Sequence, residues 1–87
     1  MVKKEILIKS PAGLQMGLAG SFCDTAVAFD SIITFRCADG SYEGNAKSIL
    51  SVLGACIKSG DTIELICDGA DENTAMEKLL AVFENWE

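Results

Sequence analysis

Two stretches of the chain alternate hydrophobic and polar positions, which is typical of a β-strand with one buried face. In Val2–Lys9, Ile6 and Ile8 fall on one face and Leu7 falls on the other. The same alternation runs through Thr62–Cys67, where the hydrophobic face carries Ile63, Leu65 and Cys67. The pattern therefore predicts a strand near the start of the chain and another in its last third.

Two further strands are predicted on either side of a hairpin turn. Ser31–Cys37 is rich in β-branched and aromatic residues, which favour strands. The segment Ala38–Ser41 follows it and contains Asp-Gly, a pair typical of tight hairpin turns. We therefore expect the residues from Tyr42 to about Ala46 to return as the second strand of a hairpin.

Hydrophobic residues recur every three or four positions in three other stretches, and this spacing predicts amphipathic helices. The first stripe, in a helix expected from Met16, comprises Leu18, Phe22, Ala26 and Phe29. The second and shorter stripe comprises Ile49, Val52, Leu53 and Cys56. The third, which is the clearest, comprises Met76, Leu79, Leu80, Phe83 and Trp86.

Residues near the expected helix ends agree with these assignments. Ser48 directly precedes the second stripe, where a hydroxyl can cap free backbone N–H groups, and Gly54 is expected to limit that helix. Asp68, Asp71 and Glu72 precede the third stripe, where negative charge suits the helix dipole. The predicted order is β-α-β-β-α-β-α. We expect a single α+β domain over residues 1–87, an open-faced sandwich whose four-stranded, mainly antiparallel sheet is covered on one face by three helices.

Composition excludes several classes of function. The 87 residues carry a net charge of −6, which disfavours nucleic acid and anionic membranes as partners because both attract clustered Lys and Arg. No apolar run approaches the roughly 20 residues that a membrane span requires. No secretory leader is recognisable at the start of the chain, so a cytoplasmic location is expected. Nothing in the sequence calls for a cofactor.

The four cysteines allow two interpretations. An even number in a short chain can form a disulfide framework. However, Cys23, Cys37, Cys56 and Cys67 lie within apolar periodic segments, so we expect buried, reduced thiols that act as small hydrophobes. The sequence contains no Cys-x-x-Cys pair and no histidine, and we therefore expect no metal site.

Three stretches of the sequence match a known family. AKSILSVL (Ala46–Leu53) resembles the regulatory-serine segment of HPr, the histidine-containing phosphocarrier family of the bacterial sugar phosphotransferase system. GDTIELICDGADENTAMEKL (Gly60–Leu79) resembles the last strand and last helix of that family. AGLQMGLA (Ala12–Ala19) aligns with its active-centre loop, which usually reads G-[IL]-H-A-R-P-A. The element order of the family also agrees along the full length.

The resemblance breaks down at the active centre. Gln15 stands at the position of the phosphorylated histidine, Met16 at the alanine, Gly17 at the arginine and Leu18 at the proline. Crh-type relatives also have Gln at the histidine position but keep the arginine and proline. The lone pair of an amide nitrogen is delocalised into the carbonyl, so Gln15 cannot accept a phosphoryl group as an imidazole does. We therefore expect a chain that is neither a phosphocarrier nor an enzyme.

The resemblance implies that Ser48 is a regulatory phosphorylation site and that a nearby apolar patch binds partner proteins. On this chain the patch comprises Met16, Ile49, Leu50 and Leu53. The residues themselves also allow a plainer interpretation. Ser48 can serve only as a helix cap, Ile49 and Leu53 fall mostly on the core side of the stripe, and Leu50 is the residue expected to face outward.

Three functions follow, in order of preference. The first is an HPr-like regulatory protein that lacks the phosphoacceptor and is switched at Ser48, with an HPr-type kinase or a transcription regulator as partner. The second is a diverged protein-interaction module that is unrelated to sugar transport. The third is a true phosphocarrier. The sequence leaves the oligomeric state open.

Overall fold

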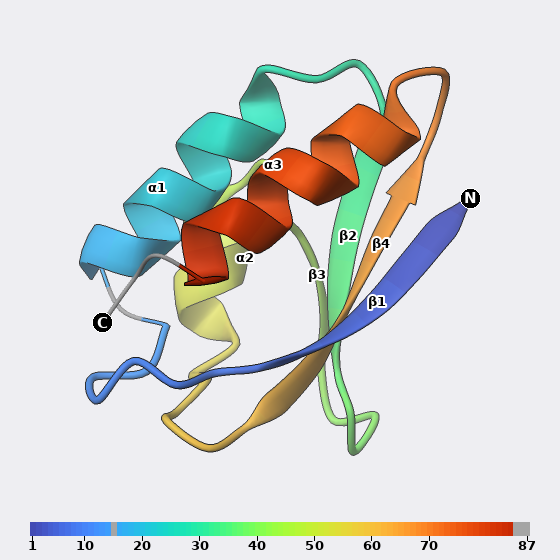
Figure 1. Cartoon of the computed structure of the whole chain (residues 1–87). Coiled ribbons are helices and arrows are strands. Elements are labelled where there is room, and N and C mark those ends of the chain that lie inside the picture. Colours follow the sequence, from blue (N-terminus) through green and yellow to red (C-terminus); the bar gives the residue numbers. More distant parts are fainter. Residues whose placement is uncertain (15, 85–87) are drawn as a thin grey trace.

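A computed structural model describes residues 1–14 and 16–84 (Figure 1). Its elements follow the predicted order β-α-β-β-α-β-α. They are β1 (Val2–Leu7), α1 (Met16–Val27), β2 (Ile32–Cys37), β3 (Glu43–Asn45), α2 (Ile49–Gly54), β4 (Thr62–Asp68) and α3 (Glu72–Glu84).

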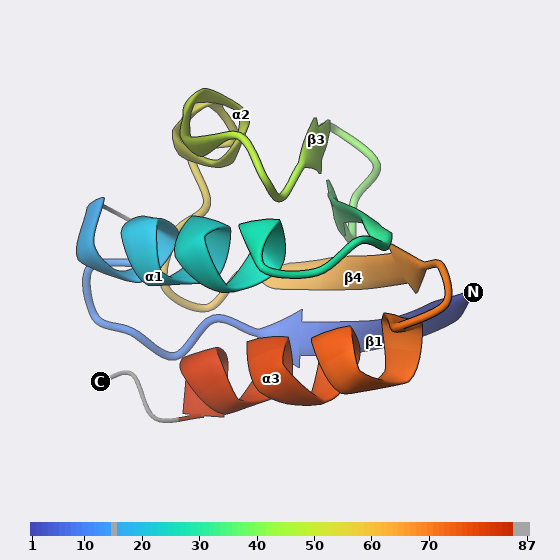
Figure 2. The same ribbon diagram turned by 90° about the horizontal axis from the view of Figure 1, so that it is seen from above.

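The four strands form one antiparallel sheet in the order β1-β4-β2-β3. The C-terminal strand β4 therefore lies between β1 and β2, with Ile6 opposite Ile63 and Phe35 opposite Leu65. The three helices lie on one side of the sheet, and α1 lies between α2 and α3 (Figure 2). The predicted open-faced α+β sandwich is confirmed.

The buried faces of the strands are those that the alternation predicted. Ile6 and Ile8 are buried, whereas Leu7 between them is 51% exposed. The predicted buried face of β4, made of Ile63, Leu65 and Cys67, has no exposed surface at all. On the helical side, Phe22 of α1 packs edge-on against Phe35 of β2 and Phe83 of α3, with ring centroids 6.1 and 5.1 Å away. One core thus joins the sheet to its helices.

Several element boundaries differ from the prediction. β1 ends at Leu7 and not at Lys9. The N–H of Ile8 still donates to the carbonyl oxygen of Asp61, just before β4, at 2.9 Å, but the N–H of Asp61 donates to the carbonyl oxygen of Lys58 and does not return the bond, so the regular pairing with β4 stops there. α1 ends at Val27, so Phe29 packs on the core from outside the helix. The predicted core residue Trp86 lies outside the described residues.

The cysteine prediction is only partly correct. All four thiols are free, and Cys23 and Cys67 are buried as expected. Burial raises the pKa of both thiols, that of Cys67 to about 11. Cys37 is half-buried, and Cys56 is exposed. The second apolar stripe does not extend to Cys56 because α2 ends at Gly54 and Cys56 adopts a left-handed backbone conformation with φ 52°.

Asp71 joins the loop between α1 and β2 to the start of α3. Its carboxylate accepts hydrogen bonds from the backbone N–H groups of Asp30, at 2.9 Å, and Ser31, at 3.0 Å, and from the hydroxyl of Ser31. These bonds, the one from the Ser31 side chain above all, lower the pKa of Asp71. The residue that the sequence assigned to the helix dipole is therefore also a cross-link between two loops.

We expect Asp71 to contribute to acid sensitivity. A lowered pKa in the folded state means that the ionised carboxylate stabilises the fold above its unfolded pKa, near 4, and that this stability is lost as the pH falls further. Asp71→Asn should lower stability at neutral pH and flatten the decline below about pH 4, as measured by urea unfolding at a series of pH values. Asp24→Asn, which removes an exposed carboxylate on α1, is the matched control. If the stability of Asp71→Asn declined below about pH 4 as steeply as that of the wild type, this role of Asp71 would be contradicted.

Candidate functional site

The loop between β1 and α1 is held against the segment that follows α2. The N–H of Gly13 donates to the carbonyl oxygen of Ser10 at 2.9 Å, which closes a tight turn. The N–H of Leu14 then donates to the carbonyl oxygen of Ile57 at 3.0 Å. Gly13 has φ +71°, a conformation that favours glycine. Two segments that are distant in sequence thus form one surface at the end of the molecule where α1 begins (Figure 1).

The predicted active-centre positions show little phosphate-binding chemistry. Gln15 lies outside the described residues, and of Met16 only the backbone, which begins α1, is described. Gly17 is exposed in the first turn of α1, and Leu18 is buried in the core. Gly17 offers no side chain, so it cannot supply the bidentate cation that the family's arginine provides.

Cys56 and Lys58, which follow α2 in the sequence, lie beside the loop between β1 and α1. A groove of about 720 Å³ is lined by Pro11, Ala12 and Leu14 from the loop and by Leu53, Cys56, Ile57, Lys58 and Ser59 from the other side. Lys58 and Cys56 are both exposed. No local sequence pattern indicates this arrangement, because it depends on the hydrogen bond between Leu14 and Ile57.

Ser48 caps α2 as predicted. Its backbone is extended, with φ −111° and ψ 114°, and its hydroxyl oxygen accepts a hydrogen bond from the N–H of Ser51 at 3.3 Å. The carbonyl oxygen of Ser48 accepts from the N–H of Val52 at 3.0 Å. Ser48 is only half-buried, so part of this residue is accessible at the start of a helix.

The segment before Ser48 is fixed by two neighbours. Asn45 accepts the N–H of Lys47 on its side-chain oxygen at 2.9 Å and the N–H of Ser48 on its carbonyl oxygen at 3.1 Å. The ammonium group of Lys47 donates to the carbonyl oxygen of Phe29, just beyond α1, at 2.7 Å. Ser48 is therefore presented on a well-braced turn.

The predicted partner patch is only partly exposed. Leu50 is 80% exposed, which confirms that it faces outward. Ile49 and Leu53 are half-buried and pack against the core, so each offers only part of its surface. The side chain of Met16 lies outside the described residues. An exposed leucine next to a surface serine is thus the clearest feature of this region, and its role in partner binding stays a prediction.

Neither a membrane span nor a metal site is found in the described part of the chain. No helix there is long and apolar enough to cross a membrane. Likewise, residues 1–14 and 16–84 contain no group of three or more Cys, Asp or Glu side chains placed to hold a metal ion.

Comparison with known proteins gives full-length matches. The sequence profile of the PTS-HPr family, "PTS HPr component phosphorylation site", matches residues 2–85. The HPr-like protein Crh of Halalkalibacterium halodurans is 44% identical over 84 residues, which cover 97% of this chain and 98% of that protein. The phosphocarrier protein HPr of Xylella fastidiosa strain 9a5c is 33% identical over 98% of this chain and 93% of its own. The crystal structure of HPr-C-His from Thermoanaerobacter tengcongensis superimposes with a TM-score of 0.90 at 31% identity, covering 97% of this chain and 92% of that one.

Proposed function

This chain belongs to the PTS-HPr family, and on that premise we propose that it is a regulatory, protein-binding member and not a phosphocarrier. The observation that carries the proposal is chemical: none of the 87 residues is a histidine. A phosphocarrier needs a side chain that accepts a phosphoryl group and releases it readily, and the imidazole of histidine serves this purpose. What remains is recognition of other proteins, for which we propose a cytoplasmic location.

Ser48 is the proposed switch. A phosphoryl group there would add a charge of about −1.5 to −2 and three strong acceptor oxygens beside the exposed Leu50. Its charge would favour a partner that presents an arginine and would repel an acidic one. The partial exposure of Ser48 and the turn held by Asn45 support access by a kinase. An HPr-type kinase and a transcription regulator are the proposed partners.

We expect an HPr-type kinase with labelled ATP to phosphorylate the wild-type chain and not Ser48→Ala. Ser51→Ala is the matched control, because it removes a hydroxyl from the same helix, while the backbone carbonyl of Ser51 that accepts from Tyr42 remains. Loss of the Ser48 cap costs about 1 kcal/mol, so circular dichroism must show that Ser48→Ala is folded. Equal labelling of the wild type and Ser48→Ala, or no labelling of either, would rule out the switch.

The diverged interaction module remains the alternative, and one observation favours it. Gly17 and Leu18 depart from the arginine and proline that Crh-type relatives keep, and Leu18 is a core residue here. Such a module would bind a partner whether or not Ser48 is phosphorylated. Binding that is identical for phosphorylated and unphosphorylated chains would favour the module over the regulatory protein.

A further inference from the structure

The side chains that line the groove beside the loop between β1 and α1 are mainly apolar, apart from those of Cys56, Lys58 and Ser59. Its walls include Leu14 and Ile57, which are buried, and Leu53, which is half-buried. Among the eight described residues that line it, Lys58 alone carries a charge. The volume of about 720 Å³ falls in the usual range for ligand pockets, so the groove can accept large side chains of a partner.

The backbone of Lys58 is held in place, whereas the ammonium group of its side chain is free to pair with a partner. The N–H of Lys58 donates to the carboxylate of Asp61 at 2.9 Å, and the segment packs against Gly13. Within residues 1–14 and 16–84, Lys58 makes no ion pair. Lys47 differs, because its ammonium group already donates to the carbonyl oxygen of Phe29. A single cation among mainly apolar lining side chains is complementary to a carboxylate beside an aliphatic side chain.

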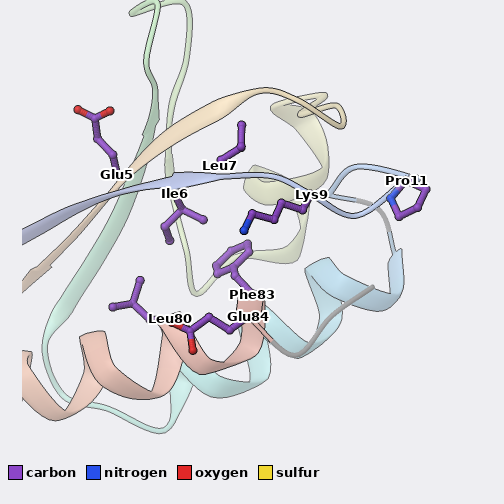
Figure 3. A pocket seen from close by; sticks show the side chains of 8 residues that line it. All are labelled: Glu5, Ile6, Leu7, Lys9, Pro11, Leu80, Phe83 and Glu84. Carbon is purple, nitrogen blue, oxygen red and sulfur yellow. The ribbon is translucent and has the colours of Figure 1, made fainter.

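A second groove carries charges of both signs, unlike the one that contains Lys58. It lies between β1 and the C-terminal part of α3, and Figure 3 shows Ile6, Leu80 and Phe83 on its two sides. Its charged residues are Glu5, Lys9 and Glu84, so both signs are present. That groove therefore gives no basis for choosing the charge of an occupant.

We propose that Lys58 determines which partners bind, by selecting a protein segment that presents an aliphatic side chain to the groove and a carboxylate to the Lys58 ammonium group. This rests on the proposed function, because it assumes that this face binds proteins. It adds the chemistry of the partner. The fold thereby places a cation, from the segment that follows α2, beside Gly13–Ala19, a stretch that contains no Lys, Arg or His of its own.

Three short peptides with blocked ends test the proposal on the ¹⁵N-labelled full chain. They alternate leucine with glutamate, with glutamine or with lysine, and are titrated at low ionic strength while amide shifts are recorded. We expect shifts around Ala12, Leu14 and Lys58, with the glutamate peptide binding about threefold to fivefold more tightly than the glutamine peptide, as for an exposed ion pair. Added salt should remove that preference.

Charge reversal supplies the control. Lys58→Glu should make the lysine peptide the tightest binder, whereas Lys78→Glu, which reverses an exposed lysine on α3, should leave the order unchanged. The proposal is overturned if the glutamate peptide shows no preference, if no shifts occur at this groove, or if both variants behave alike. Any of these outcomes would leave the phosphorylation of Ser48 intact, so this failure is distinguishable from failure of the proposed function.

Discussion

Incubation with Enzyme I and labelled phosphoenolpyruvate should leave this chain unlabelled, while a histidine-containing HPr in the same mixture becomes labelled. The amide of Gln15 is not a nucleophile, and Gly17 provides no guanidinium for the phosphate oxygens. The N–H groups at the start of α1 remain, but they can only hold an anion. The difference should be close to all-or-none, since the chain has no histidine to accept the phosphoryl group. Acid-labile label on the wild-type chain would show that it carries a transferable phosphoryl group without a histidine.

Introducing the histidine and the arginine of the family's active centre should make this chain accept the label. We expect Gln15→His together with Gly17→Arg to accept label, because Gly17 is exposed and can be replaced by a long side chain. Gly17→Arg alone is the matched control and should accept none. Leu18 is left unchanged, because it is only 3% exposed and truncating a core leucine commonly costs about 2–5 kcal/mol. If the double variant folds and still takes no label, features beyond these two residues also block transfer.

Local patterns predicted the parts of the fold that depend on burial. The period of two placed Ile6, Ile8 and Ile63 correctly because each strand has one face on the core. The cap at Ser48 was equally predictable, since the hydroxyl bonds a backbone N–H three residues along the chain. Element ends were less accurate. β1 stops before Ile8 because the N–H of Asp61, which faces Ile8, donates to the carbonyl oxygen of Lys58 and not back to Ile8.

The parts that were missed depend on contacts between distant segments. Lys58 lies beside the loop between β1 and α1 because Leu14 is hydrogen-bonded to Ile57, and no local sequence pattern predicts that bond. Cys56 fits the spacing of the second apolar stripe, but α2 ends at Gly54, before Cys56, and the Cys56 side chain is exposed. The helical spacing predicted that Leu50 faces outward. It could not indicate a binding partner, because an exposed side chain makes no contact within the fold that a sequence pattern would reflect. The site was thus predictable only where it coincided with a local structural rule or a family motif.

Gly13→Ala should be among the most destabilising small substitutions in this chain. A Cβ added at Gly13 would lie 2.6 Å from the carbonyl oxygen of Ile57 and 2.9 Å from the Cα of Lys58. Both atoms belong to the backbone, so no side-chain rotation relieves the clash. The left-handed φ of +71° adds about 1–2 kcal/mol of strain for a residue with a Cβ. With the overpacking cost of about 1–3 kcal/mol, we expect a total loss of about 2–5 kcal/mol.

Gly20→Ala is the matched control, and we expect a change of opposite sign. Gly20 lies within α1, and a Cβ there would meet nothing within 4 Å. Alanine should therefore stabilise the protein by about 1 kcal/mol through helix propensity. Urea unfolding at neutral pH, followed by circular dichroism, measures both variants against the wild type. Because Gly13 braces the segment that carries Lys58, the glutamate peptide should also bind Gly13→Ala less tightly under conditions where it remains folded. Equal stability of the two variants would show that the loop and the Ile57–Lys58 segment do not pack as closely as described.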